Sequence, residues 1–553
     1  MAVYETRNEL EQLARSVILS LFDYVEMAGA ETLDRRRFEK IRNQITKEFK
    51  LVPPRNIELV KAYKELLKNG EIEENETIYG LLVKRKIRSE SGIANITVLM
   101  KAFGCPGKCI FCPTQPGMPK SYFSTQPAML RAVRNDFDCY QQMKTRLNGL
   151  QAQGHDISKI DVRTAGGTWS SYLHDYQEFF VKSIYFALNE GPGPFLPPEE
   201  ATAKINAASL EELIKINETA NCRCVGLWVE TRPDWVTPEE INSLRRFGVT
   251  GIELGIQTTD DEVNEFNKRG HGLKESMEAT ELSRNAGLKI CHHIMPNLPK
   301  STVEKDLQTV KDLFGKGILE PDYIKVYPCM VTPYTVLAKM VEQDPAVFTS
   351  YNDDQLTKII SEIVAHVPEY CRIIRILRDF PKELIIQGTK RSNIRQILEE
   401  QGIKSRDIRA REIKGGKFDP DNVELVERKY EANNGQEYFL SFEDLKQDKL
   451  IGLIRLRLPN SQEKVTIPEL KNTALIRELH IYGTLKPLKS TQSALVSSTQ
   501  HAGYGRQLME HAEKIAKEQG WNKIAVISAV GTREYYKKLG YKLEGTYMVK
   551  YLW

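Results

Sequence analysis

Three cysteines lie close together between residues 101 and 113, in a C-x3-C-x2-C spacing: Cys105, Cys109 and Cys112. Three neighbouring thiolates can bind three irons of a 4Fe-4S cluster and leave the fourth iron open to an outside ligand. A structural zinc usually takes its four ligands as two separated pairs. The tight run therefore favours a cluster over a zinc site or over three cysteines that are simply buried.

A second group of candidates lies at the ends of predicted strands. The run Gly166, Gly167 and Thr168 follows a strand, and its glycines let a ligand approach the backbone closely. Most Gly-Gly pairs are only turns, so this feature needs support from its surroundings. Four later residues also end strands and are candidates for ligand binding or catalysis: Glu230, Gln257, Lys325 and Tyr327.

The segment from Gln500 to Arg506 has a Q-x-x-G-x-G pattern, with glycines at 503 and 505, and it opens an amphipathic helix. The first backbone amides of a helix have no partner within the helix, so they can donate to a pyrophosphate. A P-loop is excluded because no Gly-Lys-Ser/Thr follows.

The remaining cysteines are scattered, and burial explains them better than chemistry. A structural zinc held by Cys329, Cys371 and His366 is conceivable, although the spacing does not require it and the metal stays unassigned. His292 and His293 are adjacent in a strand, so they point to opposite faces and cannot bind one metal together.

Six apolar strand segments, each followed by a helical stretch, position these candidates within residues 91–365. This alternation predicts a partial (βα)6 barrel, in which functional side chains gather at the carboxyl ends of the strands. The expected strands cover residues 96–100, 160–163, 226–230, 251–257, 288–294 and 323–327.

Two basic regions flank the barrel. Residues 1–90 have a helical pattern, and their basic residues predict either solvated helix faces or a surface that binds RNA phosphates: Arg35, Arg36, Arg37, Lys40, Arg42, Lys47, Lys50, Arg55, Lys84, Arg85, Lys86 and Arg88. Residues 366–417 form a basic linker. Its arginines either line an RNA groove or pair with carboxylates at a domain interface.

Residues 418–553 predict a second, mixed α/β domain. Four strands are expected over residues 423–430, 437–442, 450–458 and 474–482, before the Gln500 segment, its helix and a further strand at 524–528. A Ser/Thr-rich loop at 490–499 precedes the glycines and could gate a bound ligand.

Composition sets broad limits on the class of protein. The chain has 553 residues, 41% hydrophobic and 27% charged, which is ordinary for globular proteins of several domains. A net charge of +4 is too small to indicate a nucleic-acid partner by itself. Nine cysteines without a regular framework, no signal peptide and no long apolar run predict a cytoplasmic protein outside the membrane.

Two of these segments are similar to known enzyme families. The cysteine spacing, with an aromatic residue before the last cysteine, resembles the signature of radical S-adenosylmethionine (SAM) enzymes. That resemblance implies that Gly166, Gly167 and Thr168 hold the methionine end of SAM, with Glu230 and Gln257 as further contacts. The Gln500 segment, with Tyr536 after the following strand, resembles the acyl-CoA motif of GNAT acetyltransferases.

The combination of the two modules resembles the catalytic subunit of Elongator, a family of tRNA uridine carboxymethyltransferases. The resemblance extends from about residue 84 to the end of the chain. It implies acetyl-CoA contacts at Lys159, Glu478, Leu479, His480, Ile481, Gln500, Gly503, Tyr504, Gly505, Arg506 and Tyr536. Tyr536 is also a catalytic candidate. Lys325 and Tyr327 are catalytic candidates because they end the last predicted strand, although a lysine within a strand more often extends its amine to solvent. The resemblance is not traced into the residues before about 80.

The chemistry implied by this resemblance needs a 4Fe-4S cluster, SAM, an electron donor, acetyl-CoA as co-substrate and tRNA as substrate. A 5′-deoxyadenosyl radical would activate the methyl group of acetyl-CoA for addition to C5 of the wobble uridine. The alternative is a protein lysine acetyltransferase whose cluster is structural or regulatory, and a third is an RNA-binding protein without turnover. The sequence leaves open whether the chain forms a homodimer.

Overall fold

The computed structural model describes residues 7–83, 92–391, 394–413, 418–460, 464–483 and 503–552. The basic cluster at residues 84–88, the loop at 490–499 and Gln500 lie outside these ranges. Within them, no helix is long and apolar enough to cross a membrane.

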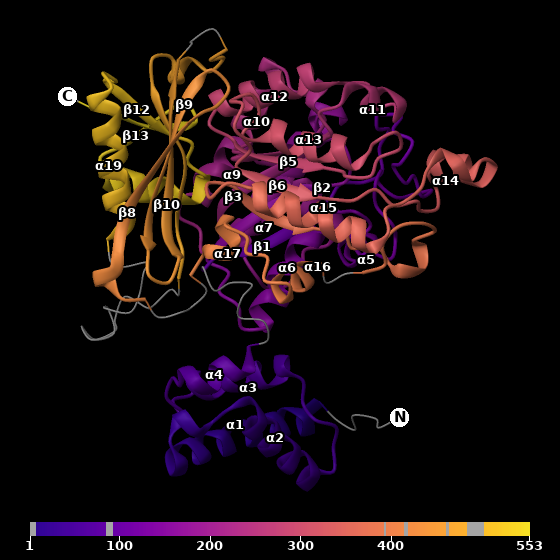
Figure 1. Ribbon diagram of the computed structural model, residues 1–553. Coiled ribbons are helices and arrows are strands. Elements are labelled where there is room, and N and C mark those ends of the chain that lie inside the picture. Colours follow the sequence, from indigo (N-terminus) through magenta and orange to yellow (C-terminus); the bar gives the residue numbers. More distant parts are fainter. Residues whose placement is uncertain are drawn as a thin grey trace.

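Four helices form a separate N-terminal bundle, drawn apart from the rest of the molecule in Figure 1. Apolar residues at helical spacing, such as Leu13, Val17 and Leu21, close its own core. The Tyr79 hydroxyl donates to the Gly154 carbonyl at 2.9 Å, which joins the bundle to the next domain. The helices are α1 (Arg7–Ala28), α2 (Arg35–Phe49), α3 (Asn56–Lys68) and α4 (Glu76–Leu82).

Parallel strands form a seven-stranded sheet in sequence order in the described part of the chain. Because successive strands are neighbours and are joined by helical crossovers, the sheet curves into a half-barrel. The predicted half-barrel followed by a mixed sheet is confirmed. The strands are β1 (Ala94–Leu99), β2 (Lys159–Ala165), β3 (Arg223–Thr231), β4 (Gly251–Gln257), β5 (Lys289–Ile294), β6 (Tyr323–Val326) and β7 (Arg372–Ile376).

The seventh strand, β7, was not predicted. It lies in the segment 366–417 that we expected to be a linker, and it extends the sheet beyond the six predicted strands. Its arginines mask the strand pattern, because Arg372 and Arg375 flank the apolar pair Ile373 and Ile374. The segment is therefore partly a member of the sheet.

The two faces of the half-barrel differ in character. The outward side chains of each strand are apolar, for example Ile96, Val162 and Ile290, and they pack in the main core with the surrounding helices. The helices between and after the strands of this domain are α5 (Pro127–Arg134), α6 (Cys139–Ala152), α7 (His174–Glu190), α8 (Pro198–Ala207), α9 (Leu210–Asn217), α10 (Pro238–Arg246), α11 (Asp261–Phe266), α12 (Leu273–Asn285), α13 (Val303–Leu313), α14 (Val336–Gln343), α15 (Asp353–His366), α16 (Ile394–Glu400) and α17 (Ile408–Arg411).

The C-terminal domain is a mixed sheet in the order β13-β14-β12-β11-β10-β9-β8, and the pair β11–β12 is parallel. Helix α19 (Tyr504–Glu518) packs on it through Leu508, Met509 and Ala512, at the predicted helical period. The other elements are β8 (Val423–Glu431), β9 (Gly435–Asp444), β10 (Lys449–Pro459), β11 (Ala474–Ile481), β12 (Lys523–Val526), α20 (Arg533–Lys538), β13 (Lys542–Glu544) and β14 (Tyr547–Tyr551).

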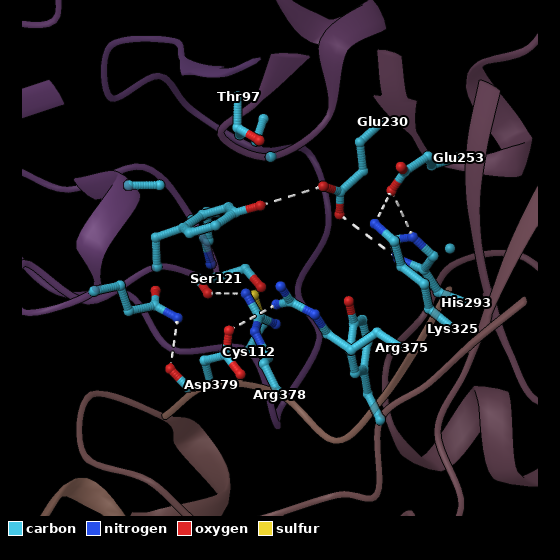
Figure 2. Close-up of a pocket in the computed structure, with 18 of the residues that line it drawn as sticks. Thr97, Cys112, Ser121, Glu230, Glu253, His293, Lys325, Arg375, Arg378 and Asp379 are labelled. Carbon is cyan, nitrogen blue, oxygen red and sulfur yellow. Dashed lines mark hydrogen bonds and ion pairs between the residues drawn. The ribbon is translucent and has the colours of Figure 1, made fainter. Parts of the chain in front are cut away.

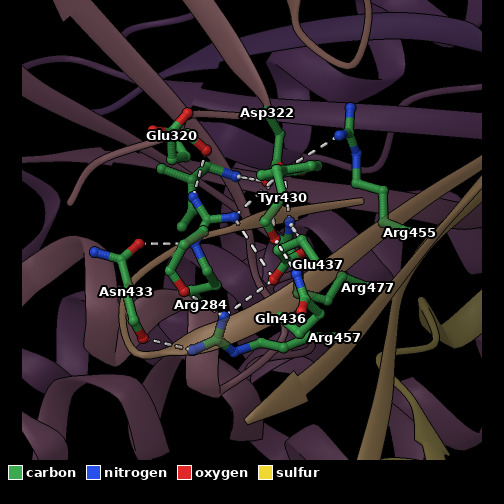
Figure 3. Close-up of polar contacts among 12 residues, drawn as sticks. Arg284, Glu320, Asp322, Tyr430, Asn433, Gln436, Glu437, Arg455, Arg457 and Arg477 are labelled. Atoms are coloured by element: carbon green, nitrogen blue, oxygen red, sulfur yellow. Dashed lines mark hydrogen bonds and ion pairs between the residues drawn. The ribbon is translucent and has the colours of Figure 1, made fainter. Parts of the chain in front are cut away.

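A buried network of charges joins the two domains (Figure 3). Arg477 on β11 donates to both carboxylate oxygens of Asp322, which precedes β6, at 2.8 and 2.6 Å. It also donates to Glu437 on β9 at 2.9 Å. Arg457 on β10 donates to Asn285 of α12 at 2.7 Å. The half-barrel and the mixed sheet thus share one polar core.

Several arginines of the 366–417 segment also lie at this interface. Arg372 donates to Glu412 at 2.6 Å, and Arg411 pairs with Glu443 and with Asp448. These contacts agree with the expectation that the arginines pair with carboxylates between domains. Others of the set face a cavity of the half-barrel, which is described below.

Candidate functional site

A cavity of about 840 Å³ opens at the carboxyl ends of the barrel strands, and three predicted cluster ligands line it: Cys105, Cys109 and Cys112. All three come from the loop that follows β1. Five further predicted residues line the same cavity: Gly167, Thr168, Glu230, Gln257 and Lys325. Tyr327 lines it as well. Polar residues from distant strands therefore meet at one end of the barrel, as its parallel topology predicts.

Polar and charged groups lie next to the sulfur atoms of the cysteine loop. Arg269 donates to the Cys109 sulfur at 3.1 Å, and Thr168 lies 3.5 Å from the Cys105 sulfur. Burial raises the pKa of the Cys112 thiol to about 12. A buried thiolate needs a cation next to it, and a bound iron supplies one. The donor set therefore fits a cluster.

No group of three His, Cys, Asp or Glu side chains within the described ranges is arranged around one metal ion. This is compatible with a cluster, because each of its cysteines binds a different iron. It gives no support to the zinc site that we considered at Cys329, Cys371 and His366. Cys329 and Cys371 are buried in different apolar clusters.

The glycines after β2 have a backbone that other residues rarely adopt. The φ angles of Gly166 and Gly167 are 131° and 111°. A Cβ atom on Gly166 would lie 3.2 Å from the Met100 amide nitrogen, so this glycine permits close packing of two loops. Gly166 itself is not among the lining residues, whereas Gly167 and Thr168 face the cavity.

Two predicted contacts at other strand ends face the same space. Glu230 ends close to the Tyr122 hydroxyl, which donates to it at 3.4 Å. Gln257 has a φ of 74°, and its buried Oε1 atom has no hydrogen-bond partner within the described part of the chain. A buried polar atom left without a partner is a place where a ligand can donate. The cavity wall thus fits a polar molecule such as SAM.

Lys325 is held by a group of charged residues on the inner face of the barrel (Figure 2). Its amine pairs with Glu253, which also accepts from His293 at 2.8 Å and from Arg163 at 2.6 Å. The positive partners hold the pKa of Glu253 well below its usual range despite its burial. The carboxylate in turn raises the pKa of Lys325. The lysine therefore stays an ammonium group at neutral pH.

Sequence reasoning missed three members of this group: Arg163, Glu253 and His293. A charged residue within an otherwise apolar strand was the available signal, since the segment 251–257 has Glu253 between Ile252 and Leu254. What the sequence could not provide is which of these charges meet across the sheet.

A second cavity of about 900 Å³ lies at the opposite end of the barrel, where the strands begin and the mixed sheet packs against them. Most of the predicted acetyl-CoA contacts line it: Lys159, Glu478, Leu479, His480, Ile481, Gly503, Gly505, Arg506 and Tyr536. Tyr504 is not among the lining residues. Its ring packs against Phe442 with centroids 4.8 Å apart.

The start of α19 gives this cavity an anion-binding edge. Gly503 caps the helix with a left-handed backbone, φ 81°, which directs the first free amides of a 15-residue helix toward the cavity. A Cβ atom on Gly505 would lie 3.0 Å from the Tyr535 hydroxyl. Basic side chains of Lys159, Arg223 and Lys538 also line the cavity, so it fits the phosphates of a nucleotide cofactor.

The side chains on the inner wall of the second cavity are either neutral or paired with an opposite charge. Glu478 pairs with Arg455 at 2.9 Å and accepts from the Tyr323 hydroxyl. Arg455 therefore lowers the pKa of Glu478 against the effect of burial. Burial raises the pKa of Tyr536, so its hydroxyl stays protonated and can donate.

Family comparisons match separate parts of the chain. Residues 177–313 match the Radical SAM superfamily, and residues 321–403 match the Radical SAM C-terminal domain. Residues 406–541 match the acetyltransferase (GNAT) family. The radical SAM matches end at residue 403 and the GNAT match begins at residue 406, between the last strand of the half-barrel and the first strand of the mixed sheet.

Similar proteins extend over almost the whole chain. The tRNA uridine(34) acetyltransferase of Methanocaldococcus jannaschii is 38% identical over 99% of this chain and 99% of its own length. The Elongator complex protein 3 of Dictyostelium discoideum is 35% identical over 90% of this chain and 88% of its own. A solved structure of archaeal Methanocaldococcus infernus Elp3, with an N-terminal deletion of residues 1–46, is 37% identical. It covers 83% of this chain and 99% of its own, with a TM-score of 0.69.

Proposed function

This chain belongs to the family of the tRNA uridine(34) acetyltransferases and Elongator complex protein 3, and we propose that it modifies C5 of the wobble uridine in tRNA. It is an enzyme with a radical SAM domain and a GNAT domain. One observation carries the proposal. The same half-barrel has a cavity with three cluster-type cysteines at one end and a cavity with a GNAT-type helix start at the other.

The proposed product is carboxymethyluridine, formed from the acetyl group of acetyl-CoA after hydrolysis of the thioester. When bound, a 4Fe-4S cluster and SAM supply the 5′-deoxyadenosyl radical that removes a hydrogen atom from the acetyl methyl group. Cys105, Cys109 and Cys112 would hold the cluster, and an outside electron donor would reduce it. The walls of the cavity would shield such a radical from other hydrogen donors.

Five residues are proposed to hold SAM on this side of the barrel. The backbone of Gly166, Gly167 and Thr168 offers amides and carbonyls to its amino-acid end. The carboxylate of Glu230 can accept from a ribose or amine group, and the partnerless Oε1 of Gln257 can do the same.

Lys325 and Tyr327 are proposed to act on the uracil ring. Because Glu253 keeps the Lys325 amine charged, the ammonium group can donate to a uracil carbonyl and hold C5 toward the radical carbon. The Tyr327 hydroxyl lies on the same wall and keeps its proton, since burial raises its pKa.

Acetyl-CoA is proposed to bind in the second cavity. The amides at the start of α19, together with Lys159 and Arg506, would bind the pyrophosphate. The edge of β11 from Glu478 to Ile481 would align the pantetheine arm beside the strand. The Tyr536 hydroxyl can donate to the thioester carbonyl and thereby assist attack by water.

The tRNA is proposed to bind across exposed basic residues of α2 and the arginines at the mouth of the first cavity. Arg35, Arg36 and Arg37 are exposed, and Arg375 and Arg378 line the cavity. Contacts to phosphates make such binding weaken as salt rises. The wobble base must leave the anticodon stack to enter the cavity.

Anaerobic reconstitution of the cluster tests this function. The full chain is incubated with SAM, dithionite, acetyl-CoA and tRNA, and the digested tRNA is examined by nucleoside mass spectrometry. The proposal predicts 5′-deoxyadenosine together with a carboxymethylated uridine at position 34. Formation of acetyl-lysine on protein without a modified nucleoside would instead favour a lysine acetyltransferase.

A further inference from the structure

The inner face of the half-barrel connects the two cavities. Within most strands, a residue that faces the second cavity is followed two positions later by one that faces the first. These pairs are Asp161 and Arg163 on β2, Trp228 and Glu230 on β3, Tyr323 and Lys325 on β6, and Arg372 and Ile374 on β7. Two residues of a strand span about 7 Å. The cavities are therefore separated by about one layer of side chains.

Much of this layer is polar, unlike the packed apolar interior of a closed (βα)8 barrel, and Trp228, Tyr323 and Ile374 form a small apolar cluster within it. Asn95 and Thr97 on β1, Arg163 on β2 and Glu253 on β4 all point inward, because their outward neighbours such as Ile96 and Val162 belong to the main apolar core. Polar side chains at an inner face can separate and let a polar molecule pass, which a close-packed apolar core does not permit.

Two residues, Asn95 and Arg163, line both cavities. Arg163 donates to Glu253 at 2.6 Å on the side of the first cavity. Its Nε atom also lies 3.5 Å from Asp161, which faces the second cavity. The guanidinium group lies 4.4 Å from the centre of the Trp228 ring. Arg163 thus occupies the boundary between the cavities.

We propose that Arg163 is a gate, and that its movement opens a passage along the barrel axis through which the acyl end of acetyl-CoA reaches the first cavity. This inference rests on the proposed function, because it supplies the route by which the acetyl methyl group meets the radical. The adenosine and pyrophosphate stay at α19 while the flexible pantetheine arm extends past β2 and β6.

The surroundings of Arg163 support two stable positions. Glu253 keeps two other hydrogen-bond partners, the Lys325 amine and the His293 ring, when Arg163 leaves it. Asp161 and the Trp228 face remain available to the displaced guanidinium. Neither position leaves a buried charge alone, so the exchange avoids the large penalty for an unpaired buried ion. A side chain with two alternative partners is a typical switching element.

An electrophilic CoA derivative tests the passage without radical chemistry. The full-length, cluster-loaded chain carries Ile374→Cys, which places a thiol on the wall of the first cavity. Bromoacetyl-CoA bound in the second cavity would alkylate this thiol. The sulfur–carbon bond forms, bromide leaves and the thiol proton passes to the buffer. Peptide mass spectrometry then measures the rate at which residue 374 is labelled.

The gate predicts that Arg163→Ala, in the Ile374→Cys chain, speeds labelling by about tenfold or more, because one charge-assisted hydrogen bond no longer holds the closed state. Arg163→Lys, which keeps the ion pair, should label near the original rate. Arg131→Ala is the matched control, since Arg131 lines the first cavity only, and its rate should stay within about twofold. Arg163→Gln serves as a second gate variant should the alanine variant fold poorly.

Two outcomes would overturn the gate. In the first, Arg163→Ala and Arg163→Gln leave the labelling rate of residue 374 unchanged. In the second, labelling persists when saturating desulfo-CoA occupies the second cavity. The latter would mean that the reagent enters through the open mouth of the first cavity. Binding of desulfo-CoA, measured by calorimetry, separates this failure from that of the proposed function. If desulfo-CoA binds but residue 374 is not labelled in any of these chains, only the passage is wrong. If it does not bind, the acetyl-CoA site itself is wrong.

Discussion

At the scale of single residues, two arginines lie next to the Cys109 sulfur in the cysteine loop. Arg269 contacts Cys109 directly, and Arg232 lies 4.0 Å from the same sulfur. Arg232 is fixed by Asp234, to which it donates at 2.9 Å. Fixed positive groups next to this sulfur suit a cluster, whose thiolate ligands carry negative charge.

Cys109→Ser should abolish cleavage of SAM and leave the affinity for tRNA nearly unchanged. The substitution removes one cluster ligand, whereas the proposed tRNA contacts lie on other surfaces. 5′-Deoxyadenosine is measured by chromatography and tRNA binding by filter retention. Cys139→Ser is the control, because this buried thiol only donates to the Phe180 carbonyl, at 3.6 Å. Equal loss of both functions in Cys109→Ser would indicate a purely structural metal.

Gly505→Leu should weaken acetyl-CoA binding. A Cβ atom at this position already lies 3.0 Å from the Tyr535 hydroxyl, so a larger side chain must enter the cavity. Overpacking of this kind costs about 1–3 kcal/mol, which corresponds to a loss in affinity of roughly five- to 150-fold. Calorimetric titration with desulfo-CoA measures it, with Gly149→Ala as a control at an open helical position. Unchanged affinity would remove Gly505 from the site.

At the scale of elements, strand positions were predictable and charge partners were not. The apolar runs of β1 to β6 identify the half-barrel, since a buried parallel strand needs apolar residues on its outer face. The contacts of Glu253 with Arg163, His293 and Lys325 join four strands. The alternation of residue types along one strand does not show which charged residues pair across neighbouring strands. β7 was missed for a related reason, because its arginines find partners only in the folded chain.

The acyl-CoA segment shows the same limit. The sequence predicted α19 and its glycine start, because the period of Leu508, Met509 and Ala512 is a local property. It did not predict that the Tyr504 ring turns away from the cavity toward Phe442, since that depends on the packing of α19 against β9. Local patterns therefore located the element, and the sheet determined the side-chain direction.

The free energy of unfolding should depend on pH because of His292, which lies on β5 where this strand contacts α12. His292 is fully buried, and desolvation with the nearby Arg284 lowers its pKa to about 3 from 6.5. Between these values the unfolded chain binds a proton that the folded chain does not, so stability falls as pH falls below 6.5. From pH 7 to pH 5, His292 should account for a loss of about 2 kcal/mol.

His292→Gln tests this dependence, because glutamine can keep a hydrogen bond to Thr280, which lies 3.1 Å from the histidine ring. Guanidinium unfolding at both pH values is compared between the two chains. Between pH 7 and pH 5, the free energy of unfolding of the variant should fall by about 2 kcal/mol less than that of the unsubstituted chain. Equal losses would show that His292 does not control acid stability.

At the scale of the whole molecule, the buried charges of Figure 3 tie the two catalytic domains together. Tyr323 begins β6, directly after Asp322, and Lys325 of this strand faces the first cavity, while Arg477 and Glu478 lie on β11 beside the second. Asp322 binds Arg477, and Tyr323 binds Glu478. Strand β6 therefore contacts both sites, which keeps their separation fixed.

Arg477→Met should destabilise the protein by about 3–5 kcal/mol, because it removes the nearest cation that Asp322 and Glu437 share and leaves them Arg284, 3.8 Å from each carboxylate. Scanning calorimetry should show a lower midpoint and separate transitions for the two domains. Arg246→Met is the control, since Arg246 pairs with Glu178 and Glu211 at the surface, where such pairs contribute about 1 kcal/mol or less. Equal effects of the two variants would contradict a coupling role for the buried network.

The central claim is that one half-barrel brings the acetyl group of acetyl-CoA to the radical formed from SAM. The most direct measurement uses acetyl-CoA deuterated at its methyl group, with SAM, reductant and tRNA. The account predicts that the 5′-deoxyadenosine released carries deuterium and that the modified uridine retains two deuterium atoms. 5′-Deoxyadenosine free of deuterium, together with a modified uridine, would contradict it.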